Sequence, residues 1–285
     1  MWRHKLDMVA ALATESALAA LNDAEKVLSY ESMNSQALVK SGLTYAIDMM
    51  RIAGFVAPVV FARELQLALA LPELDEVNYR CLSRSFRVVI DYLRVALNSG
   101  VAPSLYLYQE AIWLSDISQN LPPPCGSFFA PILFWQANEG LAGAIDATAG
   151  LSRQLYQSAL LAFLRDQNKL GLVQIADQLN QIAQAIKPGS SKTSYHVCAV
   201  FLKVVSGKAE PLSQDENLLF SLLDSVFFKQ VSHGLKPEPV LISRLLHVIA
   251  KSRIRSAMVN DMQDGFNLDG LLYGSAPLTQ LKKCA

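Results

Sequence analysis

The sequence has few histidines and cysteines, and it has no excess of charge of either sign. Among 285 residues there are four histidines and four cysteines, and 25 basic residues balance 25 acidic ones. A protein that mainly binds nucleic acid carries a basic surface, so the zero net charge argues against that class. Because Cys81, Cys125, Cys198 and Cys284 form no CxxC pair, we expect free thiols in a reducing cytosol.

Long apolar runs are also missing. The uncharged run 52–62 is bounded by Arg51 and Arg63 and is interrupted by Gly54 and Pro58. A membrane-spanning helix needs about 20 apolar residues, so this run is too short. Basic residues near the N-terminus are followed by no apolar run or cleavage site of a signal peptide. We therefore expect a cytoplasmic protein that does not insert into a membrane.

Apolar residues recur at helical spacing through most of the chain, and no stretch alternates as a strand would. Hydrophobic residues make up 52% of the sequence and charged ones 18%, which is enough for a large core. The sequence therefore predicts an all-α fold. Two of the clearest stripes are Leu6, Val9, Ala10, Ala13, Ala17, Leu21, Ala24 and Leu28, and Leu172, Ile175, Ala176, Leu179, Ile182, Ala183 and Ile186.

Proline, glycine and capping residues divide this pattern into about ten helices. The run 122–127, which contains three prolines and a glycine, cannot be helical and is the best candidate for a domain boundary. We expect two antiparallel helical bundles, residues 1–120 and 121–285. The first expected helix carries the stripe from Leu6 to Leu28. The others are 35–54, 58–71, 75–98, 103–120, 149–167, 170–186, 192–206, 213–232 and 238–251.

The histidines do not form a reactive or metal-binding set. His4 lies at the terminus, His196 and His247 lie in apolar helical stretches where a core role is expected, and His233 precedes a helix break. No H-x-x-x-H spacing occurs, which excludes the usual zinc site on a helix. We expect Asp48 and Arg51, three residues apart, to form a structural ion pair.

Signatures of cofactor and nucleotide binding are absent as well. The sequence has no GxGxxG, no GxxxxGK[ST] and no GxSxG. Residues 261–269 contain an Asp-Gly pair, as calcium loops do. If Gly265 occupies the glycine position of such a loop, Met262 and Leu271 stand at positions that require oxygen ligands. We therefore expect no metal, no cofactor and no enzymatic activity.

Aromatic residues are frequent around the expected boundary, and two interpretations of them stay open. They could pack in the core, or they could line a groove that binds a partner, since aromatics are enriched at interfaces. The residues concerned are Tyr106, Tyr108, Trp113, Phe128, Phe129, Phe134 and Trp135.

One family matches the order of motifs along most of the chain. Residues 40–67, with Met50-Arg51-Ile52-Ala53-Gly54-Phe55 and the pair Glu64-Leu65, resemble a histidine-phosphotransfer-like module. This module is found in the N-terminal region of the pilus chemosensory kinase ChpA (PilL) and in its kinase-less relative FimL. Residues 153–165 and 195–202 are similar to later helices of this family. Leu222-Leu223-Asp224, His233-Gly234, 236–238 and 245–250 then follow in the family's order.

The resemblance implies a phosphotransfer-like bundle that has lost its active residues. A phosphotransfer module carries H-x-x-[KR]-G on one helix, because an exposed imidazole must attack the phosphoryl group. In this chain Ser41 lies near the histidine position, and Thr44 and Tyr45 lie near the Lys-Gly positions. A serine cannot replace the imidazole, so the module should not pass phosphate. The only H-x-x-K in the sequence, residues 233–236, is followed by Pro237 and lies in a helix break.

By this resemblance the chain is an adaptor of a bacterial type IV pilus (twitching motility) chemosensory or cyclic-AMP regulatory system, with possible recruitment to the cell pole. Its partners would be a receiver domain or a polar scaffold protein. The expected partner-binding residues surround position 41 on one helix face: Lys40, Ser41, Thr44, Tyr45 and Asp48. Two alternatives stay open, an all-α enzyme with an unrecognised pocket and an active phosphotransfer protein that uses another histidine.

Overall fold

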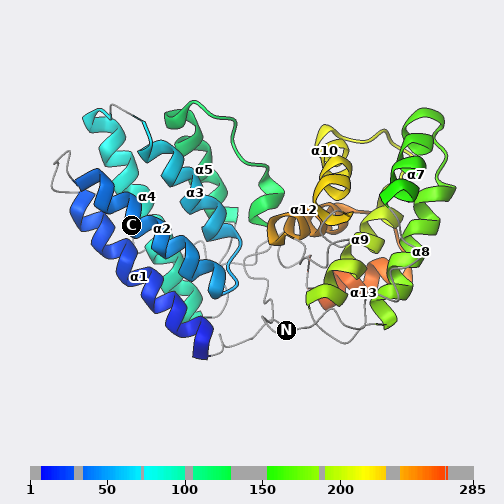
Figure 1. Cartoon of the computed structure of the whole chain (residues 1–285), viewed down its shortest axis with the longest axis horizontal. Coiled ribbons are helices and arrows are strands. Elements are labelled where there is room, and N and C mark those ends of the chain that lie inside the picture. Colours follow the sequence, from blue (N-terminus) through cyan, green and yellow to red (C-terminus); the bar gives the residue numbers. More distant parts are fainter. Residues whose placement is uncertain are drawn as a thin grey trace. The chain divides into compact units, whose positions relative to one another are not determined.

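A computed structural model describes residues 8–28, 35–71, 74–99, 105–129, 153–185, 190–228, 238–266 and 268 (Figure 1). Within these ranges the regular structure consists of helices, with no strand, so the predicted all-α fold is confirmed. The chain divides into two compact units, whose described parts are residues 8–129 and 153–268. Each unit is described by itself, and the division of the chain at 120–121 stays a prediction.

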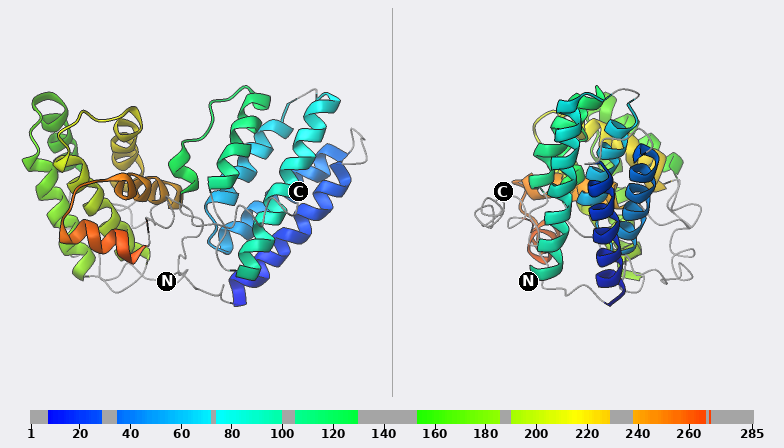
Figure 2. Two further views of the ribbon diagram at one scale, coloured as in Figure 1. Left: turned by 180° about the vertical axis from the view of Figure 1, so that it is seen from behind. Right: turned by 90° about the vertical axis from the view of Figure 1, so that its left-hand side faces the viewer.

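The first unit is built around one enclosed helix, α3 (Ala57–Leu69). Ten of its residues are buried, and it contacts α2, α4, α5 and a short 3-10 helix, η1. A helix surrounded in this way must be apolar nearly all round. Figure 2 shows the other long helices of the unit running alongside one another. Their bounds are α1 (Met8–Leu28), α2 (Ser35–Ile52), α4 (Glu76–Ser99), α5 (Leu105–Ser118) and η1 (Cys125–Phe128).

The turn from α2 into α3 requires a glycine. Gly54 has φ 81°, a left-handed conformation that L side chains rarely adopt. Its N–H donates to the Arg51 carbonyl (3.0 Å), and the N–H of Phe55 donates to the Met50 carbonyl (2.9 Å). These two bonds form a Schellman motif, which satisfies the last carbonyls of α2. Pro58 lies in the first turn of α3, as predicted.

The proline-rich run 122–127 corrects one prediction. Its last residues form the 3-10 helix η1, so the statement that the run cannot be helical is wrong for Cys125–Ser127. Pro124 can begin this turn because it contributes only its carbonyl, which accepts from the N–H of Ser127 (2.8 Å). η1 packs against α3 and α5 and places the buried Phe128 ring 5.7 Å from that of Tyr108.

The second unit is built around α9 (Ser190–Gly207), which contacts α8, α12 and α13. Residues 197–202 of α9 are buried without interruption, as expected for an enclosed helix. Lys203, the next residue, forms an ion pair with Asp177 of α8 (2.7 Å). The other elements are α7 (Arg153–Asp166), α8 (Leu170–Ala185), α10 (Gln214–Leu222), a π-helix η3 (Leu223–Phe228), α12 (Pro239–Lys251) and α13 (Ala257–Gly265).

The predicted apolar stripes form the cores of both units. On α1, six of the predicted positions from Ala10 to Leu28 are buried, whereas Val9 is exposed. The stripe of α8 is buried from Leu172 to Ala183. Leu6 and Ile186, the outermost members of the two stripes, lie outside the described residues. Periodicity therefore identified the inward faces correctly, except for one residue in the first turn of α1.

Two features of the second unit differ from the prediction. The expected helix 213–232 begins at a capping box, in which Ser213 and Glu216 satisfy each other's backbone N–H groups, but from Leu223 it widens into the π-helix. Helix α13 was not predicted, because residues 261–269 were considered only as a calcium loop. It is short, it is capped by Ser256, and its inward residues Val259 and Met262 form too small a stripe to stand out.

Close packing between α7 and α8 depends on Gly171. A Cβ atom at this position would lie 2.8 Å from the Cβ of Ala159 and 3.2 Å from its Cα. Because the second contact is with backbone, the helices would have to move apart. We expect Gly171→Ala to lower the free energy of unfolding by about 1–3 kcal/mol.

The matched control is Gly265→Ala, since a Cβ there would meet nothing within 4 Å. Urea denaturation of both variants, followed by circular dichroism, measures the difference. Equal stability of the two variants would show that the α7–α8 contact has room for a methyl group.

Candidate partner-docking face

The predicted partner-binding residues lie on the outward face of α2. Ser41, Thr44, Tyr45 and Asp48 are exposed and Lys40 is half-buried. The inward face consists of residues that are fully or almost fully buried, which are Val39, Leu43, Ala46, Ile47 and Met50. The side-chain carboxylate of Asp48 accepts from Arg51 (2.7 Å), so the predicted ion pair is confirmed. The helix therefore brings the five residues together on one accessible surface.

A line of large apolar side chains crosses this face. Leu38, Tyr45 and Ile52 are 66%, 51% and 57% exposed and are spaced seven residues apart. Two turns of an α-helix take about seven residues, so the three side chains lie nearly in line, opposite the core. The prediction included Tyr45 but missed Leu38 and Ile52, although their spacing was readable from the sequence. Each of the three side chains exposes apolar surface on this face.

The positions that would carry phosphotransfer chemistry have other contacts. The hydroxyl of Thr44 donates to the Lys40 carbonyl (2.8 Å) and accepts from the side-chain amide of Gln66 on α3 (2.9 Å). It therefore connects α2 to α3. Ser41, near the expected histidine position, has an exposed side chain without an imidazole. Positions 41, 44 and 45 of this face therefore carry hydroxyl groups and no imidazole.

Two of the histidines lie within the described residues. His247 is buried, and burial, helped by the charge of Lys251, lowers its pKa to about 4. His196 is half-buried, and its pKa is lowered mainly by burial, with Lys192 adding to the effect. Its Nε2 is buried and has no hydrogen-bond partner among the described residues. Both therefore have the core positions that were predicted, and neither is presented as an open imidazole. His4 and His233 lie outside the described ranges.

Other chemical groups among the described residues include a buried glutamate on α3 and three cysteines. No group of three or more His, Cys, Asp or Glu side chains there could hold a metal ion. Glu64 is buried on α3, and burial raises the pKa of its carboxyl group. A hydrogen bond with Ser115 of α5 lowers this pKa and partly offsets the effect of burial. Cys81, Cys125 and Cys198 are free thiols. None of the described helices has the length and apolar character needed to cross a membrane.

The aromatic residues near residue 120 divide between the two interpretations. Phe128 and Phe129 are buried in the first unit, as core residues would be. Trp113 is 49% exposed, and the guanidinium of Arg84 lies 4.6 Å from the centre of its ring. Phe134 and Trp135 lie outside the described residues, as does the side chain of Tyr106. Core packing is therefore correct for the two phenylalanines, whereas Trp113 remains available to a partner.

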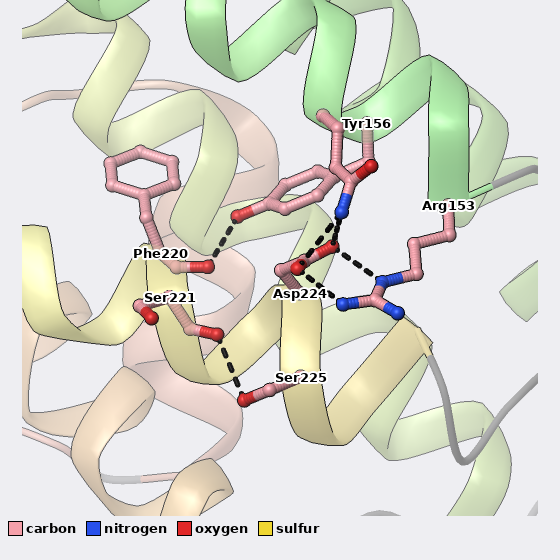
Figure 3. A network of polar contacts seen from close by, with 7 residues as sticks. Arg153, Tyr156, Phe220, Ser221, Asp224 and Ser225 are labelled. Carbon is pink, nitrogen blue, oxygen red and sulfur yellow. Dashed lines mark hydrogen bonds and ion pairs between the residues drawn. The ribbon is translucent and has the colours of Figure 1, made fainter.

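The second unit contains a polar network between α7 and the π-helix (Figure 3). Arg153 donates from Nε and a terminal nitrogen to the two carboxylate oxygens of Asp224, at 2.8 and 2.7 Å. The side-chain amide of Gln157 donates to the same two oxygens at 2.9 and 3.0 Å. The Arg153 guanidinium holds the pKa of Asp224 below its usual value, although partial burial opposes it. This bidentate arrangement fixes the start of η3 against α7.

The same junction is held by hydroxyl groups that donate to helix carbonyls. Tyr156, which is buried, donates to the Phe220 carbonyl (3.0 Å), and Ser225 donates to the Ser221 carbonyl (3.0 Å) (Figure 3). The ring of Phe220 lies 6.0 Å from that of Phe163 and 5.6 Å from that of Phe201. A π-turn widens a helix locally and frequently marks a functional position. Here aromatic packing and side-chain hydrogen bonds stabilise it.

This part of the chain matches a known family. Residues 142–278 match the sequence model of the FimL scaffold protein second domain. The second half of the chain is FimL-like. The match covers α7 to α13 and includes Arg153, Gln157 and Asp224, so the FimL resemblance predicted from the sequence is confirmed for this half. Neither the curated proteins nor the solved structures contain a match.

The Asp224 network of the FimL-like domain predicts a pH-dependent stability. Because its folded-state pKa is lowered, Asp224 contributes stability that is present above its unfolded pKa and is lost as the pH falls through the folded pKa. We expect Asp224→Asn to lower the melting temperature at pH 7, with a difference from the parent protein that shrinks below about pH 4.

Asp166→Asn is the matched control, because Asp166 pairs only with its exposed neighbour Arg165 among the ion pairs of α7. Thermal melts of the three proteins across this pH range measure the effect. A deficit of Asp224→Asn that stayed constant down to pH 3 would show that the carboxylate charge does not stabilise the junction.

Proposed function

We propose that this protein is a non-catalytic scaffold that docks other proteins through the outward face of α2 and passes no phosphate. The observation that carries the proposal is the composition of this face. Where a phosphotransfer module would present a histidine, the exposed helix presents Ser41 within a line of apolar side chains, Leu38, Tyr45 and Ile52. A surface that keeps apolar contact area without the reactive group is suited to binding alone.

The match to the FimL scaffold protein second domain supports a scaffold role. By the resemblance noted in the sequence, the system served would be a type IV pilus chemosensory or cyclic-AMP regulatory system. A receiver domain or a polar scaffold protein is then the proposed partner, and the cytoplasm, with recruitment to the cell pole, is the proposed location. The first unit would act as a phosphotransfer-like bundle without the transfer.

The polar residues of the face fit a role in orienting such a partner. Asp48 and Arg51 form an exposed pair close to Tyr45, and Lys40 lies one turn before Thr44. Exposed charges at the rim of an interface contribute to partner choice and to the rate of association more than to affinity. The apolar line would supply most of the binding energy, because large side chains at the centre of an interface dominate it.

Tyr45 is the residue that tests the proposal most directly. Tyr45→Ala should weaken binding of a receiver domain from the same genome by roughly 1–2 kcal/mol, because an interface aromatic loses its contact area. The melting temperature should change little, since half of this side chain is exposed in the free protein. Isothermal titration calorimetry of the full chain provides both the affinity and the stoichiometry.

Leu161→Ala is the matched control, because Leu161 of α7 is a large apolar side chain that is 67% exposed in the other unit. Its replacement should leave receiver binding unchanged. The docking face would lie elsewhere if Tyr45→Ala lost stability and kept its affinity, or if both variants bound equally well.

A further inference from the structure

Helix α4 carries four arginines on one face, and the α2 face does not involve them. Arg80, Arg87 and Arg94 are spaced seven residues apart, and Arg84 lies one turn after the first of them. All four arginine side chains are more than half exposed. Because seven residues make two helical turns, the four side chains form a continuous stripe along α4 over about 20 Å. Here this set is named the arginine stripe.

Each arginine of the stripe has an acidic neighbour, but two of these neighbours lie beneath it. The side chain of Arg84 is 56% exposed, whereas that of its partner Glu110 on α5 is 7% exposed. The side chain of Arg87 is 70% exposed, whereas that of its partner Glu25 on α1 is 17% exposed. Glu25 also accepts from the hydroxyl of Ser83 (3.1 Å). At Arg84 and Arg87 a molecule that approaches α4 therefore meets guanidinium groups, whereas the exposed carboxylates of Glu76 and Asp91 lie beside Arg80 and Arg94.

Trp113 of α5 lies beside the arginine stripe. Arg84 stacks over its ring at 4.6 Å and donates to Glu110 of the same helix (2.7 Å). The three residues therefore place a half-exposed indole next to a held guanidinium. Tryptophan and arginine are the residues most enriched at binding hot spots, where a held side chain loses little entropy on binding. The ion pairs add to the apolar packing of α4 against its neighbours, but they give no reason for an exposed tryptophan there.

We propose that the arginine stripe and Trp113 form a second interaction surface, which binds an acidic amphipathic helix of a protein partner. The seven-residue spacing of Arg80, Arg87 and Arg94 matches a helix with glutamates at the same spacing, as in the charged flanks of a coiled coil. An apolar side chain of that helix would pack on the indole of Trp113. Guanidinium groups bind carboxylates through paired N–H donors, and each arginine has donors beyond those its neighbour uses.

Charge balance favours this partner over a nucleic acid. The acidic neighbours Glu25, Glu76, Asp91 and Glu110 cancel the four arginine charges at a distance, and the whole chain has no net charge. Binding of nucleic acid depends on a strongly positive field along the phosphate backbone. Recognition of spaced carboxylates at short range does not depend on such a field. A chain with this surface on α4 and the docking face on α2 could hold two proteins at once.

The probe for this surface is a fluorescein-labelled peptide of about 21 residues, three heptads, with glutamate at the positions that face the stripe and leucine opposite Trp113. A peptide with glutamine in place of each of these glutamates is its matched control, and a labelled single-stranded DNA is the third probe. Fluorescence anisotropy with the full chain measures binding at about 50 and 300 mM salt. The glutamate peptide should bind at least fivefold more tightly than the glutamine peptide, with a smaller difference at high salt.

Arg80→Glu and Trp113→Ala should each weaken binding of the glutamate peptide about five- to tenfold. Arg80 is suited to this test because its ion pair, with Glu76, is confined to α4 and to solvent. Arg165→Glu makes the same charge change at an exposed arginine of the second unit and should leave binding unchanged. Circular dichroism and thermal melts should show that all three variants are folded.

The proposal is overturned if the two peptides bind equally, if Arg165→Glu weakens binding as much as Arg80→Glu does, or if the DNA binds as tightly as the glutamate peptide. Trp113→Ala provides an independent measurement if Arg80→Glu is poorly folded. Loss of peptide binding in Arg80→Glu and in Trp113→Ala, with Arg165→Glu unaffected, supports an acidic helix as the partner.

Discussion

Enclosure of one helix by its neighbours is the constraint on which each unit depends. α3 in the first unit and α9 in the second have apolar side chains on almost every side, and neither could stay folded without the helices around it. The surrounding helices need only one apolar face each, toward the enclosed helix. Their outward faces are therefore free to vary without loss of the core, and both proposed binding surfaces lie on such faces, one on α2 and one on α4.

Under the proposed function, the same constraint would let the first unit keep its fold without phosphotransfer residues. Ser41, Thr44 and Tyr45 lie on the exposed side of α2, while Leu43, Ile47 and Met50 are buried and hold the helix in place. A change of the outward residues removes chemistry and costs little stability. Thr44 is the partial exception, since its hydroxyl accepts from Gln66 on α3.

The parts of the fold that sequence could predict are those decided within one or two helical turns. The stripe of α8, the helix end at Gly54, the start of α3 at Pro58 and the Asp48–Arg51 pair each depend on residues a few positions apart. The outward position of Tyr45 followed from the same periodicity. Leu38 and Ile52 follow the same periodicity, but they lie outside the turn around Ser41 to which the phosphotransfer resemblance points.

The parts that sequence could not predict depend on residues far apart in the chain. Arg153 and Asp224 are 71 residues apart, and nothing near either of them indicates that they meet. The π-helix follows from the contacts of Phe220 with α7 and α9 rather than from any local signal. The same applies to the arginine stripe, because an i, i+7 spacing of arginines was visible but the burial of Glu25 and Glu110 beneath it was not.

The central claim is that this chain binds a receiver domain and takes no phosphate from it. The most direct measurement is incubation of the full chain with a receiver domain that carries a radioactive phosphoryl group on its aspartate, followed by gel filtration and electrophoresis. The account predicts that the two proteins elute together and that all label stays on the receiver or is released as phosphate. Base-stable, acid-labile label on the chain, lost on replacement of His4, His196, His233 or His247, would contradict it.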